Sequence, residues 1–536
     1  MKFLPFLAVF LIAWHAPHRE EQIAKLDSFD LVVIGGGAAG AGVALDAVSR
    51  DRSVLLIDRG DFASQTSSKT TKLVHGGVRY LEKAVKKRDR KEFGLVTEAL
   101  HERGTLFEMA PYAVRPIAIV TPLYNWRDLP YVWFGLKLYD WIAKKAHIEK
   151  SRFLSAKKVE EKFPYIRKKG LKGGMLYYDG QFNDSRLNMS VVLTAVEKGA
   201  VALNYMEVIG LIKREGKVCG VELVDKINGE RHRVRAEVVI NATGPFADRI
   251  REMDGALLPR ICASSGTHIV LDPKYVPLDA GILIPKTADG RLLFFLPWQG
   301  MTIVGTTDHP AKVVENPLPY EEDVAYLLEH LNHYLEEEVK EVSAVWTGQR
   351  ALITDLEDSE TANLCRDHQI EVSDSGLISV IGGQWTTFRK VAEDAVDRAF
   401  GGTSQTAFLQ LIGSEGYDER AVAKLQKETG LDFGTCDRLI QSYGMRAFEM
   451  VKLSDQLIKA QVIWACREEY ARTVMDVLAR RTGLAFLNAA QADLMIESVA
   501  EVMQAELGWN EAQREKQVKA ARLEIQTMTH HSPSGQ

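Results

Sequence analysis

A glycine-rich turn between two strand-like segments constrains the fold of this chain more than any other feature. An apolar run at residues 29–34 leads into Gly35, Gly36, Gly37, Ala38, Ala39 and Gly40, and a helix-like segment at 41–49 follows. A second apolar run at 53–57 ends at Asp58, 18 residues beyond Gly40. This order predicts a βαβ unit whose turn carries the pattern GxGxxG.

The same turn indicates a dinucleotide-binding site. The first glycine permits a tight turn, the second lets the backbone approach a pyrophosphate, and the third lets the helix pack closely on the strand. The N–H groups at the start of the helix attract phosphate, and an acid at the position of Asp58 accepts a hydrogen bond from a ribose hydroxyl. The pattern by itself leaves FAD and NAD open.

Length and charge exclude several classes of protein. The chain has 536 residues, enough for two to four domains, and 46% hydrophobic with 26% charged residues is typical of a soluble globular protein. A net charge of −5 argues against a dedicated nucleic-acid binder. The five cysteines are scattered and form no CxxC pair, so we expect no metal site and a reducing compartment.

Two apolar segments raise the question of membrane contact. Residues 3–14 form an apolar run that would span roughly 18 Å as a helix, short of the ~30 Å hydrocarbon core. An interfacial anchor, a targeting segment and a frayed tail all remain open for this run. Residues 129–141 are rich in Trp and Tyr, with Lys144 and Lys145 just beyond, which fits either a monotopic membrane surface or a buried helix under a cap domain.

Three further motifs are candidates for bringing backbone close to a ligand, although each by itself is more typical of a turn. A hydroxyl-rich loop runs from Thr66 to Leu81, Asn241 to Pro245 follows a buried strand, and a glycine pair at 382–383 opens a probable helix that reaches Arg389. From about residue 416 to 527 the pattern is helical.

At this point the chain resembles the FAD-dependent glycerol-3-phosphate dehydrogenase family, in particular its mitochondrial-type branch. The resemblance covers about residues 19–508. It rests on the glycine turn and on residues 72–81, 177–184, 241–245, 294–299, 382–390, 469–473 and 478–482. The EF-hand calcium loop of animal members, D-x-[DN]-x-[DN]-G, does not follow Gly508.

The resemblance implies an α/β fold: a glutathione-reductase-like FAD-binding Rossmann domain with a β-rich substrate or cap domain and an all-α C-terminal domain. The expected division is an apolar leader and linker (1–28), FAD-binding segments (29–111, 177–255 and 345–400), a membrane-facing cap segment (112–176), a β-rich substrate domain (256–344) and a helical domain (401–530).

The resemblance also implies FAD as cofactor and oxidation of sn-glycerol 3-phosphate to dihydroxyacetone phosphate, with electrons passing to a membrane quinone. The expected partners are glycerol 3-phosphate, quinone, a membrane surface and a second copy of the chain in a homodimer. The expected location is the mitochondrial inner membrane or the cytoplasmic face of a bacterial inner membrane. An oxygen-reducing glycerophosphate oxidase and a catalytically weak flavin-binding homologue are the alternatives.

The site residues carried over from the family fall into two sets. Those for substrate and catalysis are Arg79, Tyr80, His268, Arg350, Arg366 and Gln384. His268 is the natural candidate for the base because an imidazole titrates near neutral pH, with Arg350 and a water as the alternatives. Those for the cofactor are Gly35, Gly36, Gly37, Ala38, Ala39, Gly40, Asp58, Arg59, Thr66, Ser67, Ser68, Lys72, Leu73, His75, Gly76, Ala242, Thr243, Gly244, Gly383, Gln384, Trp385 and Thr386.

One residue departs from the family pattern. The family typically has Lys at the position of Gln384, and an amide can hydrogen-bond but carries no charge. If that Lys steadies the reduced flavin or the substrate, we expect a slower enzyme or weaker substrate binding here.

Overall fold

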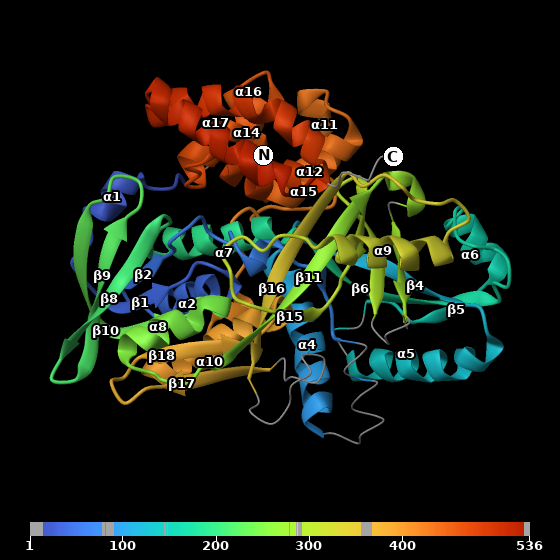
Figure 1. The fold of residues 1–536 in the computed structure, drawn as a ribbon, viewed down its shortest axis with the longest axis horizontal. Coiled ribbons are helices and arrows are strands. Elements are labelled where there is room, and N and C mark those ends of the chain that lie inside the picture. The colour runs from blue at the N-terminus through green and yellow to red at the C-terminus, as the bar shows by residue number, and fades with distance from the viewer. Residues whose placement is uncertain are drawn as a thin grey trace, which may run out of the picture.

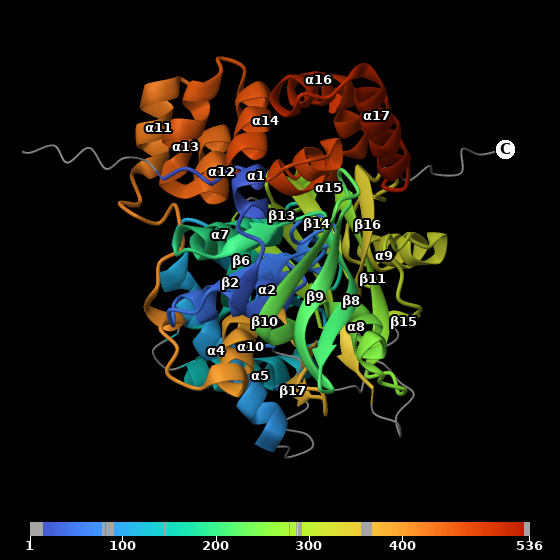
Figure 2. The ribbon, with the colours of Figure 1, turned by 90° about the vertical axis from the view of Figure 1, so that its left-hand side faces the viewer.

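A computed structural model describes residues 14–529 of the chain, except 78–80, 82–89, 144, 145, 147, 278, 286, 288–291 and 355–366. Two sheets and a helical layer make up the fold (Figure 1). The sheets lie side by side, and the C-terminal helices cover them from one side (Figure 2).

The first sheet contains the predicted βαβ unit. Strand β1 (Ser28–Ile34) leads through the glycine turn into α2 (Ala38–Val48) and then β2 (Val54–Ile57), which pairs with β1 in parallel. A Cβ on Gly40 would lie 1.8 Å from the carbonyl oxygen of Gly35, so only glycine lets α2 pack this closely on the turn. The prediction of a parallel βαβ unit is confirmed.

The other strands of this sheet come from distant parts of the chain. The order is β17-β18-β10-β1-β2-β7, and β8 and β9 form a hairpin on β10. Helices α7 and α10 pack against α2 and share its hydrophobic core. The bounds are β7 (Val201–Leu203), β8 (Met206–Arg214), β9 (Lys217–Asp225), β10 (Arg231–Asn241), β17 (His368–Val372), β18 (Ile378–Gly382), α7 (Asp184–Glu197), α8 (Ala247–Asp254) and α10 (Phe388–Phe400).

The second sheet has ten strands in the order β15-β11-β14-β13-β12-β4-β6-β3, with β16 on β11 and β5 on β6. The strands are β3 (Leu73–Val74), β4 (Val114–Leu123), β5 (Arg152–Ser155), β6 (Gly173–Phe182), β11 (Ile261–Leu271), β12 (Ala280–Ile284), β13 (Leu293–Trp298), β14 (Met301–Gly305), β15 (His309–Ala311) and β16 (Ala344–Ile353). Helices α4 (Arg90–Met109), α5 (Leu129–Ala143), α6 (Ala156–Lys162) and α9 (Glu321–Tyr334) accompany it.

Two of the expected domain boundaries fall inside strands of this sheet. The boundary at 176/177 cuts β6, which pairs with β4 continuously from Gly173 to Phe182. The boundary at 344/345 cuts the start of β16, which pairs with β11 from Ala344 to Ile353. Since continuous backbone pairing holds each strand in one sheet, residues 177–182 and 345–353 belong to the second sheet.

The C-terminal region is helical, as predicted. It contains α11 (Ala421–Thr429), α12 (Phe433–Tyr443), α13 (Ala447–Met450), α14 (Leu457–Glu468), a π-helical turn at Asp476–Arg481, α15 (Leu484–Leu487), α16 (Ala489–Leu507) and α17 (Glu511–Gln526).

Buried ion pairs attach these helices to the loop after β2 and to α7. Arg480 and Arg481 bind Asp61 at 2.6 and 2.7 Å, and Glu469 binds Arg186 at 2.6 Å.

The chain before β1 is described from Trp14 onward, so most of the apolar run at 3–14 lies outside the described residues. His15 contacts Glu468 of the helical domain, and α1 (Arg19–Ile23) follows. Within the described part of the chain, none of the helices combines the length and apolarity needed to cross a bilayer.

Candidate active site

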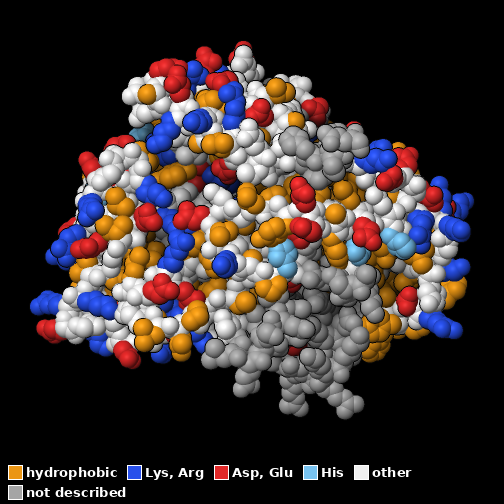
Figure 3. Space-filling model, in the orientation of Figure 1, with side chains coloured by type: hydrophobic (Ala, Val, Ile, Leu, Met, Phe, Trp, Pro, Cys, Tyr) orange, Lys and Arg blue, Asp and Glu red, His pale blue; other side chains and the backbone are white. Residues whose placement is uncertain are grey.

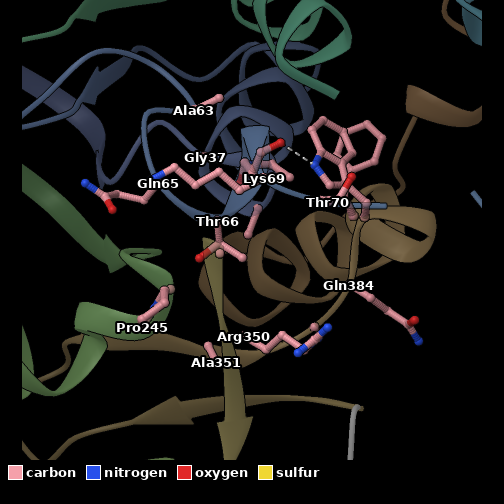
Figure 4. A pocket seen from close by; sticks show the side chains of 18 of the residues that line it. Gly37, Ala63, Gln65, Thr66, Lys69, Thr70, Pro245, Arg350, Ala351 and Gln384 are labelled. Atoms are coloured by element: carbon pink, nitrogen blue, oxygen red, sulfur yellow. Dashed lines mark hydrogen bonds between the residues drawn. The ribbon is translucent and has the colours of Figure 1, made fainter. Parts of the chain in front are cut away.

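One cavity of about 450 Å³ is lined by residues from both sheets. The glycine turn and the loop after β2 form one part of its lining, and β11, β16 and the turn after β18 form another. Figure 4 shows Gly37, Thr66 and Lys69 from the first part, and Arg350 and Gln384 from the second.

The glycine turn presents a surface suited to phosphate and ribose. Gly37 precedes α2 and has no side chain to cap it. The N–H of Ala38 is bound by Ser67 Oγ, and the helix start still directs the positive end of its dipole toward an anion. The Asp58 carboxylate accepts hydrogen bonds from the N–H groups of Gly36 at 2.7 Å and Gly60 at 2.8 Å. Burial raises the pKa of Asp58 to about 6, although these two N–H groups lower it. Its neighbour Arg59 also lines the cavity, with its guanidinium 4.2 Å from the centre of the Phe246 ring.

Hydrogen bonds from the hydroxyl-rich loop connect the two parts of the cavity lining. Ser67 Oγ accepts from the N–H of Ala38 at 3.0 Å, and the Ser67 carbonyl accepts from the indole N–H of Trp385 at 2.9 Å. The Thr66 hydroxyl donates to the carbonyl of Gln349 on β16 at 2.5 Å. This loop is therefore held against α2, β16 and the turn after β18.

His268 lies on β11 with its ring stacked on Trp346 at 4.2 Å between centroids. Its Nε2 is 2.9 Å from the hydroxyl of Thr71, and its Nδ1 is buried without a hydrogen-bond partner in the described structure. Burial, with help from the nearby cations Arg350 and Lys72, holds the pKa of His268 well below its ordinary value. The imidazole is therefore neutral at pH 7, so one of its ring nitrogens carries no proton.

Arg350 brings a cation to the same end of the cavity. It projects from β16 across Gly266, where a Cβ would lie 2.6 Å from the guanidinium. It donates to Thr306 Oγ1 at 3.2 Å and lies 3.3 Å from Asp308. A guanidinium held by several acceptors is well oriented to bind an oxygen of an anionic ligand.

Most of the expected site residues line this one cavity. Those lining it are Gly35, Gly37, Ala38, Ala39, Asp58, Arg59, Thr66, Ser67, Leu73, His75, Ala242, Thr243, Gly244, His268, Arg350, Gly383, Gln384, Trp385 and Thr386. Arg79, Tyr80 and Arg366 lie outside the described residues.

Five expected cofactor residues lie behind the cavity lining: Gly36, Gly40, Ser68, Lys72 and Gly76. Lys72 is enclosed by protein groups. Its ammonium is fully buried and bound to Asp184 at 2.7 Å and to the carbonyl of Ser68 at 2.7 Å. It also lies 4.8 Å from the centre of the Trp298 ring. These contacts tie Lys72 to Asp184 and to the hydroxyl-rich loop, whereas the cavity lining does not include it.

The sequence did not single out several lining residues. Tyr177 and Asp179 stand in a motif that carried the family resemblance, so a signal existed for them. Thr71 stands in the hydroxyl-rich loop but had no assigned role. Residues 206–208 of β8 line the cavity because the order of the strands in the first sheet places them there. The local sequence carries no signal for that order.

Comparison with known proteins agrees with this geometry. A family model described as FAD dependent oxidoreductase matches residues 30–388. A second model, the C-terminal domain of alpha-glycerophosphate oxidase, matches residues 404–514.

Named relatives narrow the family further. The mitochondrial glycerol-3-phosphate dehydrogenase of Bos taurus is 42% identical, covering 94% of this chain and 75% of its own. The human protein of the same name is 41% identical with the same coverage. The solved structure of a glycerol-3-phosphate dehydrogenase from Bacillus halodurans, complexed with FAD, is 30% identical. It has a TM-score of 0.79 and covers 97% of this chain and 99% of its own. The chain therefore belongs to the FAD-dependent glycerol-3-phosphate dehydrogenase family.

Proposed function

We propose that this protein is an FAD-dependent dehydrogenase that oxidises sn-glycerol 3-phosphate to dihydroxyacetone phosphate. The observation that carries this function is the single cavity, which joins a dinucleotide-binding turn to a neutral imidazole and a guanidinium. The substrate needs all three features: a place for its oxidant, an acceptor for the C2 hydroxyl proton and a cation for its anionic oxygens.

The residues present fit FAD. The start of α2, at Gly37 and Ala39, would hold the pyrophosphate, and Asp58 at the end of β2 would hold the ribose. The turn at Gly383 and Gln384 would lie against the flavin. When bound, FAD supplies the flavin N5 that accepts a hydride from C2 of the substrate.

His268 and Arg350 would act on the substrate itself. His268 takes the proton of the C2 hydroxyl, for which its neutral state is required. The stacked indole of Trp346 keeps the imidazole plane fixed and excludes water from one face. Arg350, whose contacts with Thr306 and Asp308 orient it, binds the developing carbonyl oxygen or the phosphate.

An anaerobic titration tests this function. The purified protein should carry FAD, and glycerol 3-phosphate should bleach the flavin absorbance while glycerol should not. Flavin that stays oxidised with excess glycerol 3-phosphate would contradict the proposal. A protein that binds no flavin at all would remove its basis.

We further propose that the electrons pass to a membrane quinone, with α5 as the membrane-facing surface. Trp133, Phe134 and Trp141 on this helix are 48%, 57% and 68% exposed. Hydrophobic side chains are visible at the lower right of Figure 3, where α5 lies in Figure 1. Arg127 and Lys150 are exposed beside this helix. Aromatic side chains settle at the headgroup level, and basic ones attract anionic lipid.

Vesicle binding tests whether α5 and the N-terminal segment attach the protein to a membrane. Sedimentation with vesicles of anionic and zwitterionic phospholipid should fall when Trp133 and Phe134 are replaced by Ser and residues 1–17 are deleted. Unchanged partitioning would rule out docking through these segments.

The mitochondrial names of the relatives support the mitochondrial inner membrane as the location.

The match of residues 404–514 to an oxidase domain favours one alternative acceptor, molecular oxygen. An oxidase would form hydrogen peroxide stoichiometrically with glycerol 3-phosphate in air, without quinone. A short-chain ubiquinone should instead raise turnover and suppress peroxide if the dehydrogenase function holds.

A further inference from the structure

The inner face of α5 makes a hydrogen-bonded contact with the cavity lining that no part of the proposed mechanism uses. The Tyr139 hydroxyl accepts from the backbone N–H of Gly76 at 2.7 Å and donates to the Asp179 carboxylate at 2.9 and 3.1 Å. Tyr139 and Asp179 are both buried. A single side chain from α5 therefore holds two separate segments of the lining, the loop after β3 and strand β6.

These segments lie at the substrate end of the cavity. Across the second sheet, Phe294 on β13 pairs with Gly305 on β14, and Gly305 pairs with His268 on β11. The ring of His75, the residue before Gly76, stacks on Phe294 at 6.5 Å between centroids. Gly76, which Tyr139 contacts, is therefore next to His75. His75 in turn packs on Phe294, whose strand is connected through Gly305 to the proposed base His268.

The close approach of Tyr139 to Gly76 leaves no room for a side chain. A Cβ on Gly76 would lie 2.7 Å from the Tyr139 hydroxyl and 2.5 Å from Leu100. Because residue 76 is glycine, its backbone N–H can reach the Tyr139 hydroxyl. This hydrogen bond holds the loop after β3 against α5.

The Tyr139 hydroxyl also donates a hydrogen bond to a negatively charged group, the Asp179 carboxylate. Asp179 lines the cavity, and its other donor is Arg103, whose Nη1 is 2.6 Å from Oδ1. Burial and the neighbouring Asp179 raise the pKa of Tyr139 well above its ordinary value, so the hydroxyl keeps its proton and remains a donor. The two donors offset a carboxylate that would otherwise repel a phosphate carrying nearly two negative charges.

We infer that Tyr139 is a positioning residue for glycerol 3-phosphate, acting through Asp179 and the Gly76 backbone. It screens the Asp179 carboxylate and fixes the loop beside His75, so that the cavity accepts an anionic substrate. This inference rests on the proposed function, because it assumes that a phosphorylated substrate occupies the cavity.

The test is Tyr139→Phe, which keeps the ring and removes the hydroxyl. Loss of one hydrogen bond to a buried charged group should raise KM for glycerol 3-phosphate about tenfold, while the limiting rate of flavin reduction changes less than about threefold. Tyr124→Phe is the matched control, because its hydroxyl donates at 2.8 Å to the carbonyl of Arg167, and Tyr124 does not line the cavity. Each variant is measured for flavin content, melting temperature and the reductive half-reaction.

A double-mutant cycle with Asp179→Asn separates screening from general destabilisation. Without the carboxylate charge, the KM effect of Tyr139→Phe should shrink to about twofold or less. An unchanged KM in Tyr139→Phe would overturn the inference, as would equal KM shifts in Tyr124→Phe or an undiminished effect in the Asp179→Asn background. If the wild-type flavin is not bleached by glycerol 3-phosphate at all, the proposed function fails instead.

Discussion

Replacing Lys72 by methionine tests whether this buried lysine holds the loop or the cofactor. The ammonium lies 2.7 Å from Asp184 and is enclosed by aromatic rings, 4.8 Å from the centre of Trp298 and 5.0 Å from that of Trp346. Methionine keeps most of the side-chain volume but leaves the Asp184 carboxylate without its cation.

The expected cost follows from the partners that remain. Removing one member of a buried ion pair costs about 3–5 kcal/mol. Asp184 keeps hydrogen bonds from the N–H and hydroxyl of Thr70 and from the N–H of Ser185, at 3.1, 2.7 and 2.8 Å. We therefore expect the low end, about 3 kcal/mol, which is roughly a 100-fold change in the unfolding equilibrium. The double variant Lys72→Met/Asp184→Asn removes both charges and should cost about 1–2 kcal/mol, less than the sum of the single changes.

The assay pairs urea unfolding with the ratio of bound flavin to protein. If Lys72 is structural, the single variant loses stability, the double variant regains part of it, and both bind FAD when folded at low urea. A Lys72→Met protein with normal stability and no flavin would refute this reasoning and return Lys72 to the cofactor site.

Two further predictions concern the site, and a third concerns the ion pairs of Asp61. Gln384→Lys should raise kcat/KM for glycerol 3-phosphate, because it restores a cation at the flavin end; steady-state kinetics that show no gain would mean that the cavity already compensates. His268→Gln should slow flavin reduction about 100- to 10,000-fold with FAD still bound, as expected for a lost general base, and a stopped-flow rate within tenfold of wild type would assign the proton to another group. Burial alone would raise the pKa of Asp61, but Arg481 and Arg480 lower it to about 2. The stability that Asp61 contributes is therefore complete above its unfolded value near 4 and lost as the pH falls toward 2; Asp61→Asn should remove this component from a stability profile between pH 5 and 2, and an unaltered profile would contradict the pairing.

The parts of the fold that could be predicted from sequence are those fixed by neighbouring residues. The βαβ unit depends on a strand, a turn and a helix that follow one another, and the third glycine is required by the carbonyl of Gly35 only five residues earlier. The helical C-terminal domain follows from its own periodicity.

The features that could not be predicted depend on residues far apart in the chain. No residue near Lys72 in the sequence indicates that Asp184, 112 residues away, forms an ion pair with its ammonium group. Strand β6 belongs to the second sheet because β4, about 60 residues earlier, pairs with it. The local pattern of residues 129–141 fits both a buried and an exposed helix. The structure places Tyr139 inward and Trp141 outward, so the two readings each describe one face of α5.

The most direct test of the central claim is the reduction of bound FAD by glycerol 3-phosphate that carries deuterium at C2. If the C2 hydrogen leaves as hydride within this cavity, anaerobic stopped-flow should show flavin bleaching slowed about two- to sevenfold by the deuterium, since breaking that bond limits the step. Bleaching at the same rate with both substrates would leave hydride transfer unsupported as the limiting step, and no bleaching with either would contradict the account.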